Sequence, residues 1–327
     1  MDLSNSCFLY DTTFSLYRVS PLYTGNSAPL DNRQLSFHAR QFQEILEGEV
    51  LRGVQVRTAT EKDLIFLNGP LKSVDWSVFH EEYIFFQDNQ HATTEGDNRV
   101  MMLTVSFDKV VYRAIFLQHI DRNGVGAGKS QAGFHHFPLL LLKMPTSIRK
   151  IFMEYVATEF DARLSSLVLS QKCLTNAFER YIAKLYNYDS DDASKDLGIG
   201  SNLSNIIKDT FVRIGFDLPN GSTSLRTIDV KIPREDVAQL INSSNNTVKL
   251  PFFEAIGAYL NTHLALDLWN PKVKIVRITC AALILDIEGK LRHTFPLSID
   301  ADNLQILAAR KLTETLIEAA IGSALNY

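Results

Sequence analysis

The sequence predicts an α+β protein with two lobes, each a largely antiparallel sheet backed by helices. The first observation is length: 327 residues are more than one hydrophobic core usually organises, since a domain takes roughly 100–200. The second is that apolar residues recur at helical steps in some segments and in strand-like runs in others. The third is the order of the second half, strand, strand, helix, helix, strand, strand, helix, which favours an antiparallel sheet with helices on one face.

In the first half we expect a strand at 12–19, a helix at 36–47 and a strand at 50–58. Residues 64–86 are apolar but interrupted by Asn68-Gly69-Pro70, so we expect short strands around a turn. Residues 99–107 and 110–120 are apolar at nearly every position and form the clearest hairpin, predicted as central strands buried on both faces.

A helix is expected from Thr146, and a second one follows a break near 164–171. Residues 187–202 have short side chains and are acidic and glycine-containing, which is typical of a mobile linker. We therefore expect an N-terminal α+β domain at 1–186, a flexible acidic linker at 187–202 and a C-terminal α+β domain at 203–327.

The C-terminal domain begins with two strands around Pro219-Asn220-Gly221 and continues with a helix that Pro233 opens. Residues 252–264 carry a helical stripe, and a long apolar hairpin follows at 273–296, with a turn at Asp286–Gly289. An amphipathic helix at 304–322 closes the chain.

Composition limits the classes of function. The net charge of −4 lacks the basic excess of proteins that bind nucleic acid by themselves, so any DNA contact requires a local patch. Cys7, Cys173 and Cys280 have no metal-binding spacing and are an odd number, which indicates a reducing compartment. The start has no signal-peptide pattern, and the longest apolar run, 137–142, is far shorter than the about 20 residues of a membrane span. We expect a cytosolic or nuclear protein without a membrane partner.

Catalytic and metal motifs are weak. The stretch NGVGAGKS at 123–130 resembles a phosphate loop ending in Lys129, but Asn123 stands where the first glycine belongs and no helix pattern follows. His80-Glu81-Glu82 lacks the second histidine of a zinc helix, and His135-His136 point to opposite faces of a strand. We therefore expect no enzyme, metal or cofactor; a nucleotide-binding enzyme using 123–130 is an alternative.

The C-terminal hairpin is the candidate interaction surface, because an open strand edge accepts a strand from another chain. The predicted partner-binding residues are Val273, Ile275, Arg277, Leu283, Leu285, Leu291 and Phe295. Lysine and arginine around the same strands are possible contacts to DNA phosphates, or else a solvated face that guards the edge. These residues are Lys272, Lys274, Lys290 and Arg292. A free-standing DNA-binding protein is thus a further alternative.

Three segments resemble the fungal members of the centromere protein L family: TTFSLYRVSPLY at 12–23, VLRGVQV at 50–56 and the helix end plus hairpin at 266–295. The resemblance implies a saddle-like antiparallel sheet backed by helices, similar in outline to the TATA-binding protein. It also implies a non-enzymatic scaffold subunit of the inner kinetochore, acting at the centromere in the nucleus.

The family further implies a heterodimer with centromere protein N, contact with other inner-kinetochore subunits, and docking of the complex on centromeric nucleosomes or DNA. The resemblance carries over no residue-level motif. A homodimer through the same sheet edge remains open, because an edge that pairs with a relative can also pair with itself.

Overall fold

The computed structural model describes residues 8–25, 30–56, 69–85, 99–118, 133–189, 210–217, 226–233, 236, 252–295 and 299–322. Clustering of contacts divides the chain into two compact units. Unit 1 contains Phe14–Ser166, and unit 2 contains Phe8–Thr13 together with Leu167–Tyr327. The predicted linker falls almost wholly on residues outside the described ranges, so the predicted domain limits stay a prediction.

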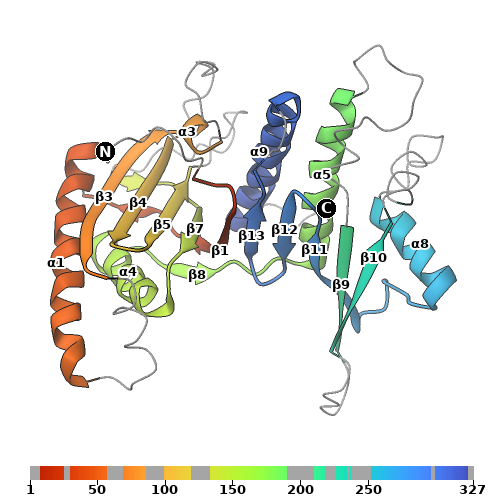
Figure 1. The fold of residues 1–327 in the computed structure, drawn as a ribbon, viewed down its shortest axis with the longest axis horizontal. Helices are drawn as coiled ribbons and strands as arrows, with labels where there is room; N and C mark the ends of the chain where they lie inside the picture. The colour runs from red at the N-terminus through yellow and green to blue at the C-terminus, as the bar shows by residue number, and fades with distance from the viewer. Residues whose placement is uncertain are drawn as a thin grey trace. The chain divides into compact units, whose positions relative to one another are not determined.

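Unit 1 is an antiparallel sheet against which two helices pack (Figure 1). Its strand order is β8-β1-β7-β5-β4-β3. The bounds are β1 Thr12–Val19, β3 Leu71–His80, β4 Arg99–Phe107, β5 Val111–Leu117, β7 Leu139–Lys143 and β8 Leu164–Ser166. The interior strands β4 and β5 are buried at most positions, so the predicted central hairpin is confirmed.

The helices of unit 1 are α1 (Asn32–Val56) and α4 (Thr146–Glu159), with a short α3 at Glu82–Phe85. Apolar side chains of α1 and α4 join those of the strands in one core, where Trp76 stacks on Phe116 at 6.4 Å between ring centroids. A small second sheet pairs β2 (Leu22–Tyr23) with β6 (Phe134–His135).

Two local predictions in unit 1 are corrected. The helix begins at Asn32 rather than Ser36, because Asp31 Oδ1 accepts hydrogen bonds from the backbone N–H groups of Arg33 and Gln34 and caps it. The strand expected at 50–58 is wrong, since α1 continues to Val56; valine's strand preference is overridden by helix continuation. Gly69 has a φ of +76°, as a glycine in the predicted turn can adopt. After this turn there is one strand of ten residues, β3, where short strands were expected.

Unit 2 has the strand order β10-β9-β11-β12-β13, with every described pair antiparallel. The bounds are β9 Thr210–Phe216, β10 Thr227–Ile232, β11 Val273–Thr279, β12 Leu283–Asp286 and β13 Lys290–His293. Gly289 adopts a φ of +74° in the turn between β12 and β13, which confirms the turn predicted there.

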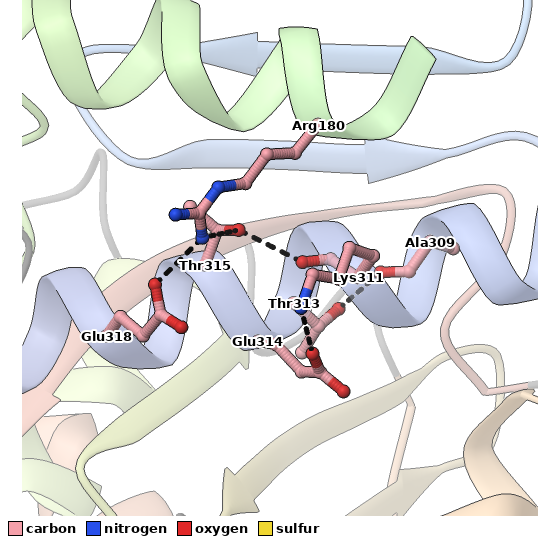
Figure 2. Close-up of polar contacts among 7 residues, drawn as sticks. All are labelled: Arg180, Ala309, Lys311, Thr313, Glu314, Thr315 and Glu318. Atoms are coloured by element: carbon pink, nitrogen blue, oxygen red, sulfur yellow. Dashed lines mark hydrogen bonds and ion pairs between the residues drawn. The ribbon is translucent and has the colours of Figure 1, made fainter. Parts of the chain in front are cut away.

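The helices of unit 2 are α5 (Gln171–Asp189), α8 (Phe252–Leu264) and α9 (Ile299–Ile321). Figure 2 shows Arg180 of α5 reaching α9, where its Nη1 lies 3.0 Å from Glu318 Oε2 and 3.4 Å from Thr315 Oγ1. The buried hydroxyls of Thr313 and Thr315 donate to carbonyls one turn earlier in α9, so both hydroxyl donors are satisfied within the helix. The α+β class predicted from the sequence is thus confirmed.

Candidate partner-binding site

The predicted partner-binding residues form the sheet of unit 2, and most of them face its core. Along β11, Val273 and Ile275 are buried while Lys274 between them is exposed, the alternation of a strand with one covered face. Leu283, Leu285 and Leu291 are at most 1% exposed. Only Arg277 and Phe295 of the predicted set are half-buried. The buried residues of the set therefore stabilise unit 2 itself. The role of the whole set in partner binding stays a prediction.

The open edge expected at 273–296 is corrected by the strand pairing. β11 pairs with β9 on one side and β12 on the other, and β12 pairs with β11 and β13. Beside β13, Tyr10 forms a parallel bridge with His293, and the Asp11 N–H donates to the His293 carbonyl at 2.7 Å. The prediction considered the hairpin by itself. In the structure, β9 lies on one side of it and Tyr10 and Asp11 lie on the other, and both come from distant parts of the chain.

The outermost strand of unit 2 is β10, which pairs only with β9 among the described strands. The Phe216 N–H donates to the Arg226 carbonyl at 3.0 Å. Phe216 and Arg226 are therefore opposite residues that are hydrogen-bonded to each other. Because such pairs alternate in an antiparallel ladder, Ile228 and Val230 bond to β9. The backbone groups of Thr227, Asp229 and Lys231 point the other way, toward the free edge.

The side chains of β10 suit an edge that a partner strand can extend. Thr227, Asp229 and Lys231 are exposed, while Ile228 and Val230, opposite buried Ile214 and Val212 of β9, are only half-buried. Charges on an edge strand discourage unspecific pairing, and half-covered apolar side chains offer area to a specific partner. The sequence analysis missed this strand as a site, although the alternation in TIDVKI marks it.

Ion pairs hold the polar face of this sheet in register. Arg213 of β9 binds Asp229 of β10 through two hydrogen bonds, Nε to Oδ1 at 2.6 Å and Nη2 to Oδ2 at 2.7 Å. The bond from Arg213 lowers the pKa of the Asp229 carboxyl, so that it stays ionised. Arg277 of β11 binds Asp286 at 3.0 Å, and Asp286 also accepts the Lys290 N–H at 2.8 Å. The first contact fixes β10 to β9, and the second joins β11 to β12.

The four possible DNA contacts fall into two groups. Lys272 and Lys274 are exposed at the start of β11. Lys290 and Arg292 are half-buried on β13, and Arg292 Nη2 lies 3.8 Å from Asp11 Oδ1. The structure therefore places the two exposed lysines, Lys272 and Lys274, close to each other in sequence at the start of one strand. The other two cations, Lys290 and Arg292, are partly covered by unit 2.

A buried polar cluster lies on the inner side of β13. His293 is 1% exposed, and burial lowers its pKa to about 4, so it is neutral near pH 7. Burial also raises the pKa of the Cys280 thiol to about 11 and that of the Tyr181 hydroxyl well above its usual value. Neutral groups of this kind are structural and supply neither a nucleophile nor a titrating base at neutral pH.

Other kinds of site find little support within the described ranges. No group of three or more histidine, cysteine, aspartate or glutamate side chains there is placed to hold a metal ion. No helix among the described residues has the length and apolar character needed to cross a bilayer. The glycine-rich stretch 123–130 lies outside the described residues.

Comparison with protein families gives one match: the family model described as centromere protein L covers residues 8–324. A comparison with individual curated proteins returned no match. The family match spans both units, including the segment at residues 8–13 that belongs to unit 2.

Proposed function

Because the chain belongs to the centromere protein L family, and is thus a kinetochore protein of the centromere, we propose that it is a non-enzymatic inner-kinetochore subunit. In this proposal it forms a heterodimer with a centromere protein N-type subunit in the nucleus. The pair then helps to assemble the kinetochore on the centromeric nucleosome for chromosome segregation.

The open edge of β10 is the observation that carries the heterodimer. A partner strand laid against β10 gains main-chain hydrogen bonds from Thr227 and Asp229, and apolar contact from Ile228 and Val230. β11 and β12 offer no such backbone groups, because both are paired on two sides. In this proposal the partner extends the sheet at β10, and the predicted residues on β11–β13 support that sheet from within.

Proline at position 227 tests the edge. Thr227→Pro removes an N–H that points away from β9 while leaving the bonds between β10 and β9 in place. We expect affinity for a co-expressed centromere protein N-type subunit to fall about 10- to 100-fold, from one lost hydrogen bond and the ring's bulk. Binding is measured by titration of the purified subunits.

Thr227→Ala is the matched control, since it removes the same side chain but keeps the N–H. It should bind within about twofold of the unchanged chain, because an exposed side chain contributes little. Equal binding by the proline and alanine variants would place the partner elsewhere. Thermal unfolding of both variants confirms that unit 2 remains folded.

Self-association through the same edge is the competing use. Two copies of β10 would pair antiparallel around a twofold axis. Light scattering of the isolated chain separates the cases: a dimer that Thr227→Pro converts to monomer assigns the edge to a second copy. A monomer that captures the centromere protein N-type subunit assigns it to the heterodimer.

DNA contact by exposed lysines is a secondary part of the proposal. Lys272 and Lys274 are solvated at the start of β11, and phosphates attract such groups without reading sequence. With a net charge of −4, the chain contributes these contacts as one part of a larger assembly.

A further inference from the structure

A hollow of about 520 Å³ lies in unit 1, far along the chain from the sheet edge discussed above. It is bounded by the turn after β2, the first turns of α1 and the end of α4. Its volume is within the range of ligand pockets and exceeds that of one side chain. The lining residues are Tyr23, Thr24, Gly25, Arg33, Gln34, Phe37, His38, Glu159 and Phe160.

Local structure fixes the walls of this pocket. The Asp31 cap starts α1, so Arg33, Phe37 and their neighbours Gln34 and His38 follow one another around a single side of the helix. Tyr23 N–H donates to the Phe160 carbonyl at 2.8 Å, which ties the β2 turn to the end of α4. The pocket is therefore preformed, and a ligand does not bear the cost of ordering it.

The wall of the pocket is aromatic. The His38 ring lies 4.7 Å from the Phe160 ring, centroid to centroid, and Phe37 contacts His38 at 5.8 Å. Phe37 is 59% exposed and Tyr23 is 37% exposed. Large aromatic side chains held open to solvent around a hollow are the usual anchors of peptide and protein recognition.

His38 acts here as a neutral group. Its Nδ1 lies 2.9 Å from the Tyr155 hydroxyl, and that hydroxyl donates to the Gln41 side chain or the His38 carbonyl. The Tyr155 hydroxyl and the His38 ring are thus hydrogen-bonded to each other, with the donor set by the histidine tautomer. Burial lowers the pKa of His38, against a smaller opposing effect of Glu159. The aromatic wall thus carries no charge near pH 7.

Two opposite charges line the pocket. Arg33 and Glu159 are both exposed, and neither side chain has an ion-pair partner within the described ranges. A free anion is a poor fit, because Asp31 already occupies the N–H groups at the start of α1 and adds negative charge beside Arg33. An aromatic wall accompanied by one cation and one anion instead matches a peptide that carries a large apolar side chain, an acidic residue and a basic residue.

We propose that this pocket of unit 1 binds a linear peptide segment of a partner protein. The segment inserts one aromatic side chain between Tyr23 and Phe37, sets a carboxylate beside Arg33 and sets a cation beside Glu159. This site is separate from the β10 edge, and its occupant is a short segment rather than a folded unit, because the volume admits about two or three side chains.

The probe is a fluorescein-labelled peptide, Asp-Gly-Trp-Gly-Lys with blocked ends, titrated with the full chain and followed by anisotropy. We expect saturable binding with a Kd on the order of 0.1–1 mM, as for a ligand of this size. Phe37→Ala should weaken binding at least about 10-fold, and its exposed position leaves the fold intact.

Reversing the charge at Arg33 gives the decisive test. Arg33→Glu should weaken the Asp-first peptide about 10-fold, and a peptide with Lys in place of Asp should bind the variant better than the unchanged chain. Lys150→Glu, an exposed charge reversal on α4 outside the pocket, is the matched control and should leave binding unchanged. Absence of saturable binding, full affinity in Phe37→Ala, or equal loss in Lys150→Glu would overturn the proposal. Each result is independent of the Thr227→Pro experiment.

Discussion

The outermost strands of the two units, β3 in unit 1 and β10 in unit 2, differ in what covers their outer edge. The Val78 N–H of β3 donates to Asn32 Oδ1 at 2.8 Å, and α1 packs along the strand. Among the described strands, β10 pairs with β9 alone, and no hydrogen bond of this kind from a helix is known for Thr227 or Asp229. An edge closed by its own helix cannot recruit a strand, whereas a strand paired on one side can. The comparison favours β10 over β3 as the edge that the proposed partner extends.

The largest effect should come from a charge placed in an interior strand. Leu285 of β12 is fully buried, so Leu285→Asp buries a carboxylate without a partner and should cost unit 2 more than about 4 kcal/mol of unfolding free energy. Thr227→Pro on the edge strand should leave that free energy within about 1 kcal/mol. Urea unfolding followed by far-UV circular dichroism measures both; similar losses would contradict the contrast between interior and edge.

Acid should destabilise unit 2 through His293. Its pKa is about 4 in the folded chain and about 6.5 when unfolded, so the unfolded state takes up the proton first. The stabilising contribution of neutral His293 is complete above about pH 6.5 and is lost as the pH falls toward 4, amounting to about 3 kcal/mol. Unfolding midpoints measured between pH 7 and 4 report it, and His293→Gln should flatten this dependence.

Opening the closed edge should have a smaller effect. Asn32→Ala leaves the Val78 N–H without its acceptor and should cost unit 1 about 1 kcal/mol, with faster hydrogen exchange at Val78. Asn32→Asp keeps an acceptor oxygen and is the control. If exchange at Val78 is the same in both variants, the side chain does not close the β3 edge.

The smallest effect on stability should come from the exposed lysines. Replacing Lys272 and Lys274 with alanine should change unfolding free energy by less than about 0.5 kcal/mol. If the two contact phosphates in the assembled complex, the slope of log affinity for DNA against log salt should become shallower by about 2. An unchanged slope would remove these lysines from the DNA contact.

Local pattern was sufficient for much of the fold. The hairpin of β4 and β5, the turn at Gly289 and the helix α8 depend on residues close in sequence, where period and turn chemistry decide the structure. The strand wrongly expected at 50–58 lies where helix continuation competes with valine preference. The outcome there depends on the rest of α1 and not on the segment itself.

The candidate sites were harder to predict because they depend on pairing at long range. Residues 273–296 do not themselves indicate that Tyr10 and β9 lie beside them. The prediction therefore put the open edge on strands that are paired on both sides. The pocket of unit 1 joins Tyr23, Phe37 and Glu159 from three segments, and no spacing rule links them. Alternation in β10 was visible, but its position at the end of the sheet follows only from strand order.

The early segment Phe8–Thr13 belongs to unit 2, although all the other described residues of that unit follow Ser166. During synthesis, Tyr10 and Asp11 leave the ribosome before any strand that they flank, and β13 is among the last elements to appear. Unit 2 therefore cannot complete its native pairing until β13 has been translated. A protein released early, or cut after residue 13, would keep most of its sequence and still lack one margin of that sheet.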